Sequence, residues 1–248
     1  MSNTNKDIQE MLDVLNLPEC SKKFDQMLGE PALGSYSPIQ FLREVLQPQY
    51  DVVLNKRFAD NLRKSSLIET DAKVENLRTG NGRVYNETTV QQLLTFRFAE
   101  DRKNVGVFGV SGVGKSYFLA AFCVEACWRN YSCKFVDYCE LLEELITLDQ
   151  SKDKSKYSRR LRHYAKYQLL FIDDFGISRF GEDGMKILYH LIKMRTDQQR
   201  STLFSSQYNP DEWGSCLGLD QSGYGKVDGI RRRLTSGYTV VIESVSFS

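Results

Sequence analysis

The residues at positions 109–116 have the types and the spacing that phosphate binding requires. They read G-V-S-G-V-G-K-S, between an apolar run that ends at Phe108 and a helix-like segment over residues 117–129. Glycines let the backbone close around a triphosphate with its N–H groups turned inward, and the start of a helix adds a partial positive field. Strand, loop and helix together predict a P-loop; the alternative is a glycine-rich turn before an ordinary helix.

Two side chains at the end of this loop have the chemistry of nucleotide binding. Lys115 would meet the β and γ phosphate oxygens as a point charge, and Ser116 would place its hydroxyl on Mg²⁺. A nucleoside triphosphate with Mg²⁺ is therefore the predicted ligand. The residues predicted to bind it are Gly109, Val110, Ser111, Gly112, Val113, Gly114, Lys115, Ser116 and Tyr117.

A pair of carboxylates follows further along the chain. Residues 168–174 read Q-L-L-F-I-D-D, an apolar strand that ends in Asp173 and Asp174. Alone the pattern is weak, because strand ends before turns often carry Asp; beside a P-loop it is typical of Walker B. Asp173 would hold Mg²⁺ through water, and Asp174 would polarise the attacking water as a general base. Asp174 is shorter than the Glu usual in motor-type NTPases, which predicts slow turnover.

Further polar groups are candidates for contacts with the γ-phosphate. Gln207 ends an apolar run and would orient water if its strand lies between the two motif strands; otherwise it is a turn residue before Asn209. Arg231, Arg232 and Arg233 precede the last strand. Because arginine forks onto phosphate oxygens, one of them could act in trans as an arginine finger on a neighbour's nucleotide. A generic basic surface is the alternative.

Basic residues are dense in one short stretch that contains a single acid, Asp153. A solvated helix face is the usual explanation for such a run. In a chain of nearly neutral charge, however, contact with the phosphate backbone of DNA explains the density better. The predicted DNA-binding residues are Lys152, Lys154, Lys156, Arg159, Arg160, Arg162 and Lys166.

Composition excludes several classes of protein. Lys and Arg total 33 against 32 acidic residues in 248, so the global charge indicates no partner. Six cysteines without a C-x-x-C pair, and two histidines, argue against zinc and for reduced thiols. Charged residues near the N-terminus interrupt any secretory signal, and no apolar run reaches membrane-spanning length. We expect a soluble cytoplasmic protein with no membrane partner.

Residues 1–75 have a helical pattern and a separate character. Ser37, Pro38 and Gln40 predict a capping box that opens a helix, and Pro48 is expected to break or kink that helix. A further helix is expected over residues 89–98. The N-terminal helices would form either a docking module for DNA or a partner, or a structural appendage, and the sequence leaves that choice open.

With these residues identified, the chain resembles insertion-sequence helper ATPases of the IstB kind, which are kin to bacterial replicative helicase loaders in the AAA+ class. The resemblance covers nearly the whole chain. Residues 109–119 and 169–176 carry blocks that many NTPases share, whereas RSTLFSSQ at 200–207 with NPDEW at 209–213 is more specific. Residues 230–234 are also similar.

The resemblance implies an α/β fold, a P-loop NTPase with an ASCE-type parallel sheet, over residues 76–248 and a small helical domain over residues 1–75. It implies bacterial origin, ATP bound between protomers of a homo-oligomer, assembly on duplex DNA and delivery of a DDE transposase. The basic run falls where the family's initiator-specific helical insertion contacts DNA. By motif match the roles are Walker A for Lys115 and Ser116, Walker B for Asp173 and Asp174, sensor 1 for Gln207 and the finger for Arg233.

Two departures from the family pattern concern arginines. The family usually has Asp before the finger, where this chain has Arg232, and it tends to end in an arginine, where this chain has Ser248. A C-terminal sensor-2 arginine is therefore expected to be missing, with Arg231 or Arg232 as candidate substitutes. Two alternative functions stay open, a replicative helicase loader and an adaptor that binds ATP without hydrolysing it.

Overall fold

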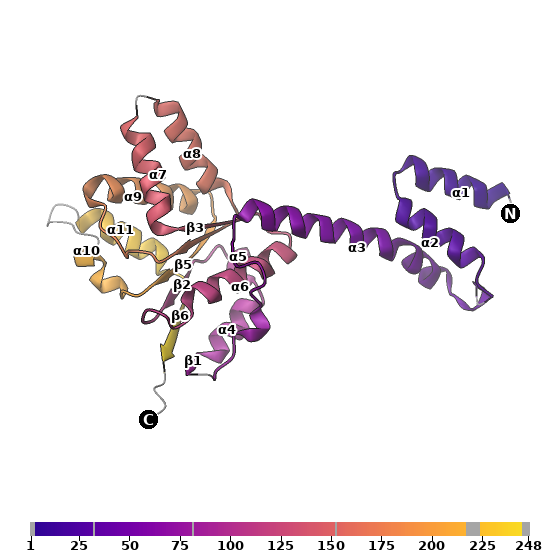
Figure 1. Ribbon diagram of the computed structural model, residues 1–248, viewed down its shortest axis with the longest axis horizontal. Coiled ribbons are helices and arrows are strands. Elements are labelled where there is room, and N and C mark those ends of the chain that lie inside the picture. Colours follow the sequence, from indigo (N-terminus) through magenta and orange to yellow (C-terminus); the bar gives the residue numbers. More distant parts are fainter. Residues whose placement is uncertain (1–2, 32, 81, 152, 217–223, 245–248) are drawn as a thin grey trace. The chain divides into compact units, whose positions relative to one another are not determined.

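The computed structural model describes residues 3–31, 33–80, 82–151, 153–216 and 224–244 (Figure 1). Contacts divide the chain into two compact units, residues 1–60 and 61–248. The domain boundary expected after residue 75 therefore falls inside the larger unit. Among the described residues, no helix is both long and apolar enough to cross a membrane.

The first unit consists of helices α1 (Asn3–Val14) and α2 (Pro18–Leu28), the 3₁₀ turn η1 (Leu33–Ser35) and most of α3 (Pro38–Ser65). Its core is a small cluster of Cys20, Phe24, Met27 and Val45. The predicted capping box is confirmed: the Ser37 N–H donates to Gln40 Oε1 (2.9 Å), and the Gln40 N–H donates to Ser37 Oγ (3.3 Å).

Helix α3 continues through Pro48, so of the two expected effects the break does not occur, and the kink stays a prediction. Proline lacks an N–H and therefore removes one backbone hydrogen bond from the helix interior. Full turns of helix on both sides of Pro48, together with the cap at Ser37, outweigh that loss over 28 residues.

The second unit is built around a mostly parallel sheet with the strand order β1-β6-β2-β5-β4-β3. Only the β1–β6 pair is antiparallel among the described strands. The strands are β1 (Arg83–Tyr85), β2 (Val105–Phe108), β3 (Cys133–Asp137), β4 (Leu169–Asp173), β5 (Ser201–Ser206) and β6 (Tyr238–Ser244). The helices and turns are η2 (Val74–Asn76), α4 (Glu87–Leu94), α5 (Arg97–Glu100), α6 (Lys115–Trp128), α7 (Tyr138–Gln150), α8 (Lys154–Lys166), α9 (Gly181–Asp197), η3 (Pro210–Glu212), α10 (Trp213–Cys216) and α11 (Tyr224–Leu234).

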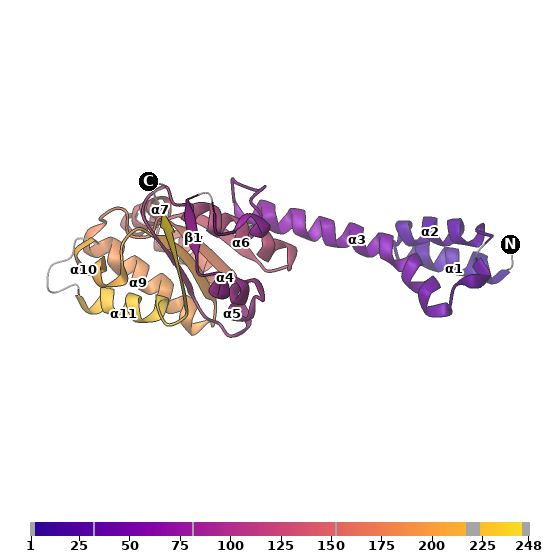
Figure 2. The same cartoon turned by 90° about the horizontal axis from the view of Figure 1, so that it is seen from below.

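Helices cover both faces of this sheet (Figures 1 and 2). Helix α6 packs on the central strands from one side, and α7, α9 and α11 share a core with the other side. Strand β2 is therefore buried at every position, as the continuous apolar run preceding the loop predicts. Trp213 is fully buried against Phe175 and Phe204.

The helix expected over residues 89–98 is interrupted, because Phe96 adopts a left-handed conformation with φ 59° between α4 and α5. Its buried ring stacks on Phe122 and Tyr131, and the Arg129 guanidinium lies 4.5 Å from the ring centroid. The left-handed backbone costs about 1–2 kcal/mol in a non-glycine residue. Packing of the aromatic ring offsets this cost.

Candidate functional site

The strand order brings the candidate catalytic residues to one edge of the sheet. Strand β5, which precedes Gln207, lies between β2 and β4, so the condition set for a role of Gln207 at the γ-phosphate is met. Phe108 pairs with Ser206, and Ile172 pairs with Phe204. The P-loop, the two carboxylates and Gln207 all follow the carboxyl ends of these neighbouring parallel strands, the usual position of ligand sites in such sheets.

The P-loop glycines are required by the local backbone. Gly112 and Gly114 have φ angles of 76° and 101°, which side chains with a Cβ rarely adopt. Gly109 lies against β6, where a Cβ would collide with the carbonyl oxygen of Ile242. The loop can therefore follow this path only with glycine at these positions.

Lys115 is buried at the base of the loop, with 5% of its surface exposed. Its Nζ donates to the carbonyl oxygen of Val110 (3.0 Å), which holds the ammonium inside the loop. Burial lowers the pKa of Lys115, and the carboxylates of Asp174 and Asp173 oppose that effect. Because burial disfavours its charge, the Lys115 ammonium would be stabilised by a negatively charged phosphate group in the loop.

Ser205 holds the two carboxylate residues together. Its Oγ donates to Asp173 Oδ1 (2.5 Å) and accepts the backbone N–H of Asp174 (2.9 Å). Burial raises the pKa of Asp174, and the neighbouring charge of Asp173 adds to the rise while Lys115 opposes it. Asp174 is therefore a better proton acceptor than an ordinary aspartate, as a general base requires.

Ser116 and Asp173 fit a magnesium ion. Both line one cavity of about 490 Å³, and residues 66–69 and part of β3 line it as well. A hydroxyl and a carboxylate are oxygen ligands of the kind that Mg²⁺ prefers. The cavity therefore leaves room beside the P-loop for the metal and its waters.

Gln207 and Tyr117 differ in how their side chains are placed. Gln207 is exposed directly after Ser206, the residue that pairs with Phe108, so its amide is available beside the loop.

The Tyr117 hydroxyl accepts hydrogen bonds from the backbone N–H of Lys73 (3.2 Å) and from the side-chain amide of Asn76 (2.9 Å). Tyr117 thus fastens the segment around η2 to the first turn of α6.

Arg83, on β1, is a residue that the sequence did not single out. The Arg83 guanidinium lies 3.1 Å from the position that a Cβ on Gly114 would occupy. This cation therefore lies against the P-loop. A single arginine in a polar stretch gives no sequence signal. Arg83 reaches the P-loop only because β1 pairs antiparallel with β6. The structure thus adds a second cation, besides Lys115, to the loop.

The arginines of α11 lie elsewhere. Arg232 and Arg233 line a cavity of about 570 Å³ together with Arg102, Asn104 and Arg200, residues that precede the parallel strands β2 and β5. This cavity therefore lies at the amino ends of the parallel strands, opposite the P-loop, which lies at their carboxyl ends. Asn104 Nδ2 donates to the Arg233 carbonyl oxygen (2.7 Å), which fixes that end of the helix.

Individual contacts also separate these arginines. The Arg233 guanidinium donates to the Gly229 carbonyl (2.7 Å) and lies 5.3 Å from the ring centroid of Tyr189. Arg231 forms ion pairs with Asp211 (2.7 Å) and Asp228 (2.9 Å). Paired with two carboxylates, Arg231 is poorly placed to contact a nucleotide.

The basic run forms helix α8, and its cations fall into two groups. Lys154 pairs with Asp149, Lys156 with Asp153, and the half-buried Arg160 with Glu144 of α7. Arg159, Arg162 and Lys166 are exposed, and no ion pair involves them among the described residues. Lys152 lies outside the described residues. The second group is the part of the helix with charge available to a polyanion.

Comparisons with known proteins show the family of this chain. The sequence profile of a family described as IstB-like ATP binding protein matches residues 11–228. The insertion sequence IS1162 ATP-binding protein of Pseudomonas fluorescens is 30% identical over 196 residues, 79% of this chain and 83% of the relative. The corresponding IS232 protein of Bacillus thuringiensis subsp. berliner is 30% identical over 128 residues, 52% of this chain and only half (50%) of the relative.

The fold is also similar to that of a solved structure, the crystal structure of DnaI. The TM-score is 0.57 at 22% identity, and the match covers 74% of this chain and 93% of that chain. This likeness confirms the predicted α/β fold of the P-loop NTPase type.

Proposed function

Because the chain belongs to the family of IstB-like ATP-binding proteins and has an AAA+ fold, we propose that it is an ATP-hydrolysing helper of transposition. It assembles with ATP on duplex target DNA, recruits or regulates a DDE transposase, and resets by hydrolysis. The single observation that carries this proposal is the convergence of the P-loop, the carboxylate pair and Gln207 on one sheet edge in a relative of insertion-sequence proteins. Those relatives favour transposition over helicase loading.

The proposed chemistry is attack of water on the γ-phosphorus of ATP. Lys115 neutralises phosphate oxygens, and Ser116 with Asp173 holds Mg²⁺, which supplies further positive charge when bound. Asp174 accepts the proton of the attacking water and Gln207 orients that water; ADP and phosphate are the products. The raised pKa of Asp174 supports its role as the base.

Arg233 acts on the nucleotide of a neighbouring subunit. Its position at the amino edge of the sheet, among Arg102, Arg200 and Arg232, supports this role, because its own P-loop is at the opposite edge. Arg83 supplies a cation in cis to the bound nucleotide, and its place against Gly114 supports that assignment.

The N-terminal unit is the proposed docking site for the transposase. Met11, Val14 and Leu15 of this unit are 61%, 79% and 66% exposed and lie close to the acidic side chains of Asp7 and Glu10. An apolar patch with an acidic rim favours a protein partner over the DNA backbone.

The test of the proposed function is assembly on DNA. Purified protein is mixed with duplex DNA and either no nucleotide, Mg-ATP or a slowly hydrolysed analogue, and complexes are measured by sedimentation and electron microscopy. We expect large DNA-bound complexes with the analogue, and few without nucleotide or with Lys115→Ala. A protein that stays monomeric and ignores DNA in all three conditions would refute the proposal. Assembly without phosphate release would favour the non-hydrolysing adaptor.

A further inference from the structure

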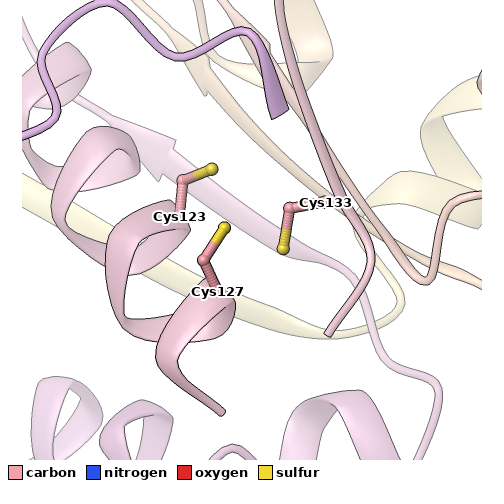
Figure 3. Close-up of side chains that lie close together, drawn as sticks. All are labelled: Cys123, Cys127 and Cys133. Carbon is pink, nitrogen blue, oxygen red and sulfur yellow. The ribbon is translucent and has the colours of Figure 1, made fainter. Parts of the chain in front are cut away.

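Three cysteines that are apart in the sequence meet in the interior of the larger unit. Cys123 and Cys127 lie one turn apart on α6, and Cys133 is the first residue of β3. Their Sγ atoms all lie within 4.8 Å of one another, and each residue is at most 1% exposed. Figure 3 shows the three sulfur atoms in one shared space between the helix and the strand.

The thiols of this cluster influence one another. Hydrogen bonds from Cys123 and Cys133 lower the pKa of Cys127 to about 5, whereas burial raises the pKa of the Cys123 and Cys133 thiols. The three sulfur atoms are therefore close enough to act on one another. A buried cysteine often serves as a small apolar residue, but that role does not require three sulfur atoms to converge.

The separation of the sulfur atoms suits a trigonal metal site. A metal–thiolate bond of about 2.3 Å places three sulfur ligands of a trigonal plane about 4 Å apart. The observed spread of up to 4.8 Å is within side-chain adjustment of that value. Two ligands one helical turn apart and a third on the adjoining strand would fix the ion from two elements.

The donor set identifies the class of metal. No His, Asp or Glu joins the three thiols in the part of the chain that the structure describes. The nearby hydroxyl of Ser65 already donates to the Leu62 carbonyl (2.6 Å) and accepts the Leu67 N–H (3.2 Å). Zn²⁺ in structural sites takes four ligands in a tetrahedron, whereas soft thiolates in low coordination select Cu(I).

We propose that Cys123, Cys127 and Cys133 form a buried three-sulfur site for Cu(I), which joins the P-loop helix α6 to strand β3. Copper stays in the +1 state, so the step is ligand exchange: Cu–S bonds form, the ion leaves its previous ligands, and thiol protons pass to solvent. The site is separate from the magnesium ligands Ser116 and Asp173 and does not depend on the proposed ATPase function.

The test uses the reduced full-length protein under anaerobic conditions. Cu(I) is supplied from a chromophoric chelator of known affinity, and transfer is followed by the loss of chelator colour. We expect one Cu(I) per chain that resists the competitor, three sulfur neighbours by X-ray absorption, and a higher thermal unfolding temperature. Zn²⁺ supplied in the same way should not displace it.

Matched cysteine variants locate the site. Cys127→Ala and Cys133→Ala should lose the competitor-resistant copper, whereas Cys20→Ala and Cys139→Ala, which remove one thiol outside the cluster, should retain it. Circular dichroism identifies variants that do not fold; if both cluster variants fail, the stoichiometry and sulfur count of the unaltered protein decide. Absence of resistant copper, neighbours other than three sulfurs, displacement by Zn²⁺, or retention in a folded cluster variant would overturn the proposal.

Discussion

Asp174 combines three local properties that decide how a substitution there will behave. Its backbone has a left-handed φ of 52°, its N–H donates to Ser205, and its carboxylate is disfavoured by burial and by Asp173. Asparagine tolerates the left-handed region and has the same shape without the charge. Alanine removes the charge too, but it adds backbone strain of about 1–2 kcal/mol.

Asp174→Asn should therefore separate catalysis from stability. We expect phosphate release to fall by about 10²-fold or more, with ATP binding retained. Thermal stability at neutral pH should rise, because the raised pKa means that the folded state disfavours the carboxylate. Asp174→Ala is the control, expected to lose activity equally and to be less stable than Asp174→Asn. Hydrolysis within a few-fold of the unaltered protein would remove Asp174 from the role of base.

The same raised pKa predicts the pH dependence of hydrolysis. A base must be ionised to accept a proton, so activity is present above its pKa and is lost as the pH falls through it. Because burial and Asp173 raise the pKa of Asp174, the rate should decline at a higher pH than the ordinary aspartate value would give. Single-turnover rates against pH, with folding checked at each point, measure this. A rate that stays constant until ordinary aspartates protonate would contradict it.

Arg83 offers a test of the P-loop contact that the sequence did not indicate. Arg83→Ala should weaken ATP binding about tenfold, the value of one charge-assisted hydrogen bond. Arg78→Ala is the matched control, because Arg78 is exposed in the same segment and donates to the Glu75 carbonyl. Titration with a fluorescent ATP analogue measures both. Equal affinity of the two variants would exclude Arg83 from nucleotide binding.

At the scale of elements, Arg195 explains how α8 is held. It is 1% exposed in α9, and its guanidinium donates to the carbonyl oxygens of Tyr164, Ala165, Tyr167 and Ser201 and to Thr202 Oγ1. Burial lowers its pKa to about 9. Arg195 thus satisfies carbonyls at the C-terminal end of α8 that the helix itself leaves without partners.

This anchored helix defines a sharp test of DNA contact. The double reversal Arg159→Glu with Arg162→Glu should weaken binding to duplex DNA of any sequence and reduce the salt slope by about 2, since each phosphate contact contributes about 0.9. These two cations are exposed and outside the ion pairs of the helix. Fluorescence anisotropy over a range of salt concentrations gives the slope.

The control for that test lies on the same helix. Lys154→Glu with Lys156→Glu makes the same change of charge, but both lysines already pair with aspartates. We expect a smaller loss of affinity and a smaller change of slope. Arg160 is left unchanged, because its pair with Glu144 joins α8 to α7. An identical effect of the two reversals would mean that net charge alone, and no defined contact, acts on DNA.

At the scale of the whole molecule, the two ends of the parallel strands carry different parts of the proposed site. One edge carries the P-loop and the carboxylates, and the other carries Arg233. A head-to-tail assembly would bring the arginine edge of one subunit to the nucleotide of the next.

Mixing two inactive variants tests this arrangement. Lys115→Ala lacks the P-loop lysine and Arg233→Ala lacks the proposed arginine finger, and each alone should hydrolyse little ATP. In a random mixture about a quarter of the interfaces combine an intact loop with an intact finger, so part of the activity should return. Phosphate release measures it, and Arg233→Ala with itself is the control. No recovery from mixed, co-assembled variants would exclude action in trans.

Sequence alone was sufficient for the features that depend on local spacing. The P-loop at residues 109–116, the capping residue Ser37 and the apolar strand before Asp173 are each specified by neighbouring residues. The strand position of Gln207 was only a condition in the sequence, and the strand order β2-β5-β4 meets it. Pro48, expected to break or kink its helix, does not break it, because helix on both sides outweighs one missing hydrogen bond.

Only the tertiary structure decided which distant residues meet. Arg83 reaches Gly114 through antiparallel pairing at the sheet edge, and three cysteines converge because α6 packs on β3. It also divided the basic run into paired and available cations, since Glu144 comes from another helix. These features depend on contacts between elements, and a linear pattern of residue types records periodicity within one element but not the partner that it packs against.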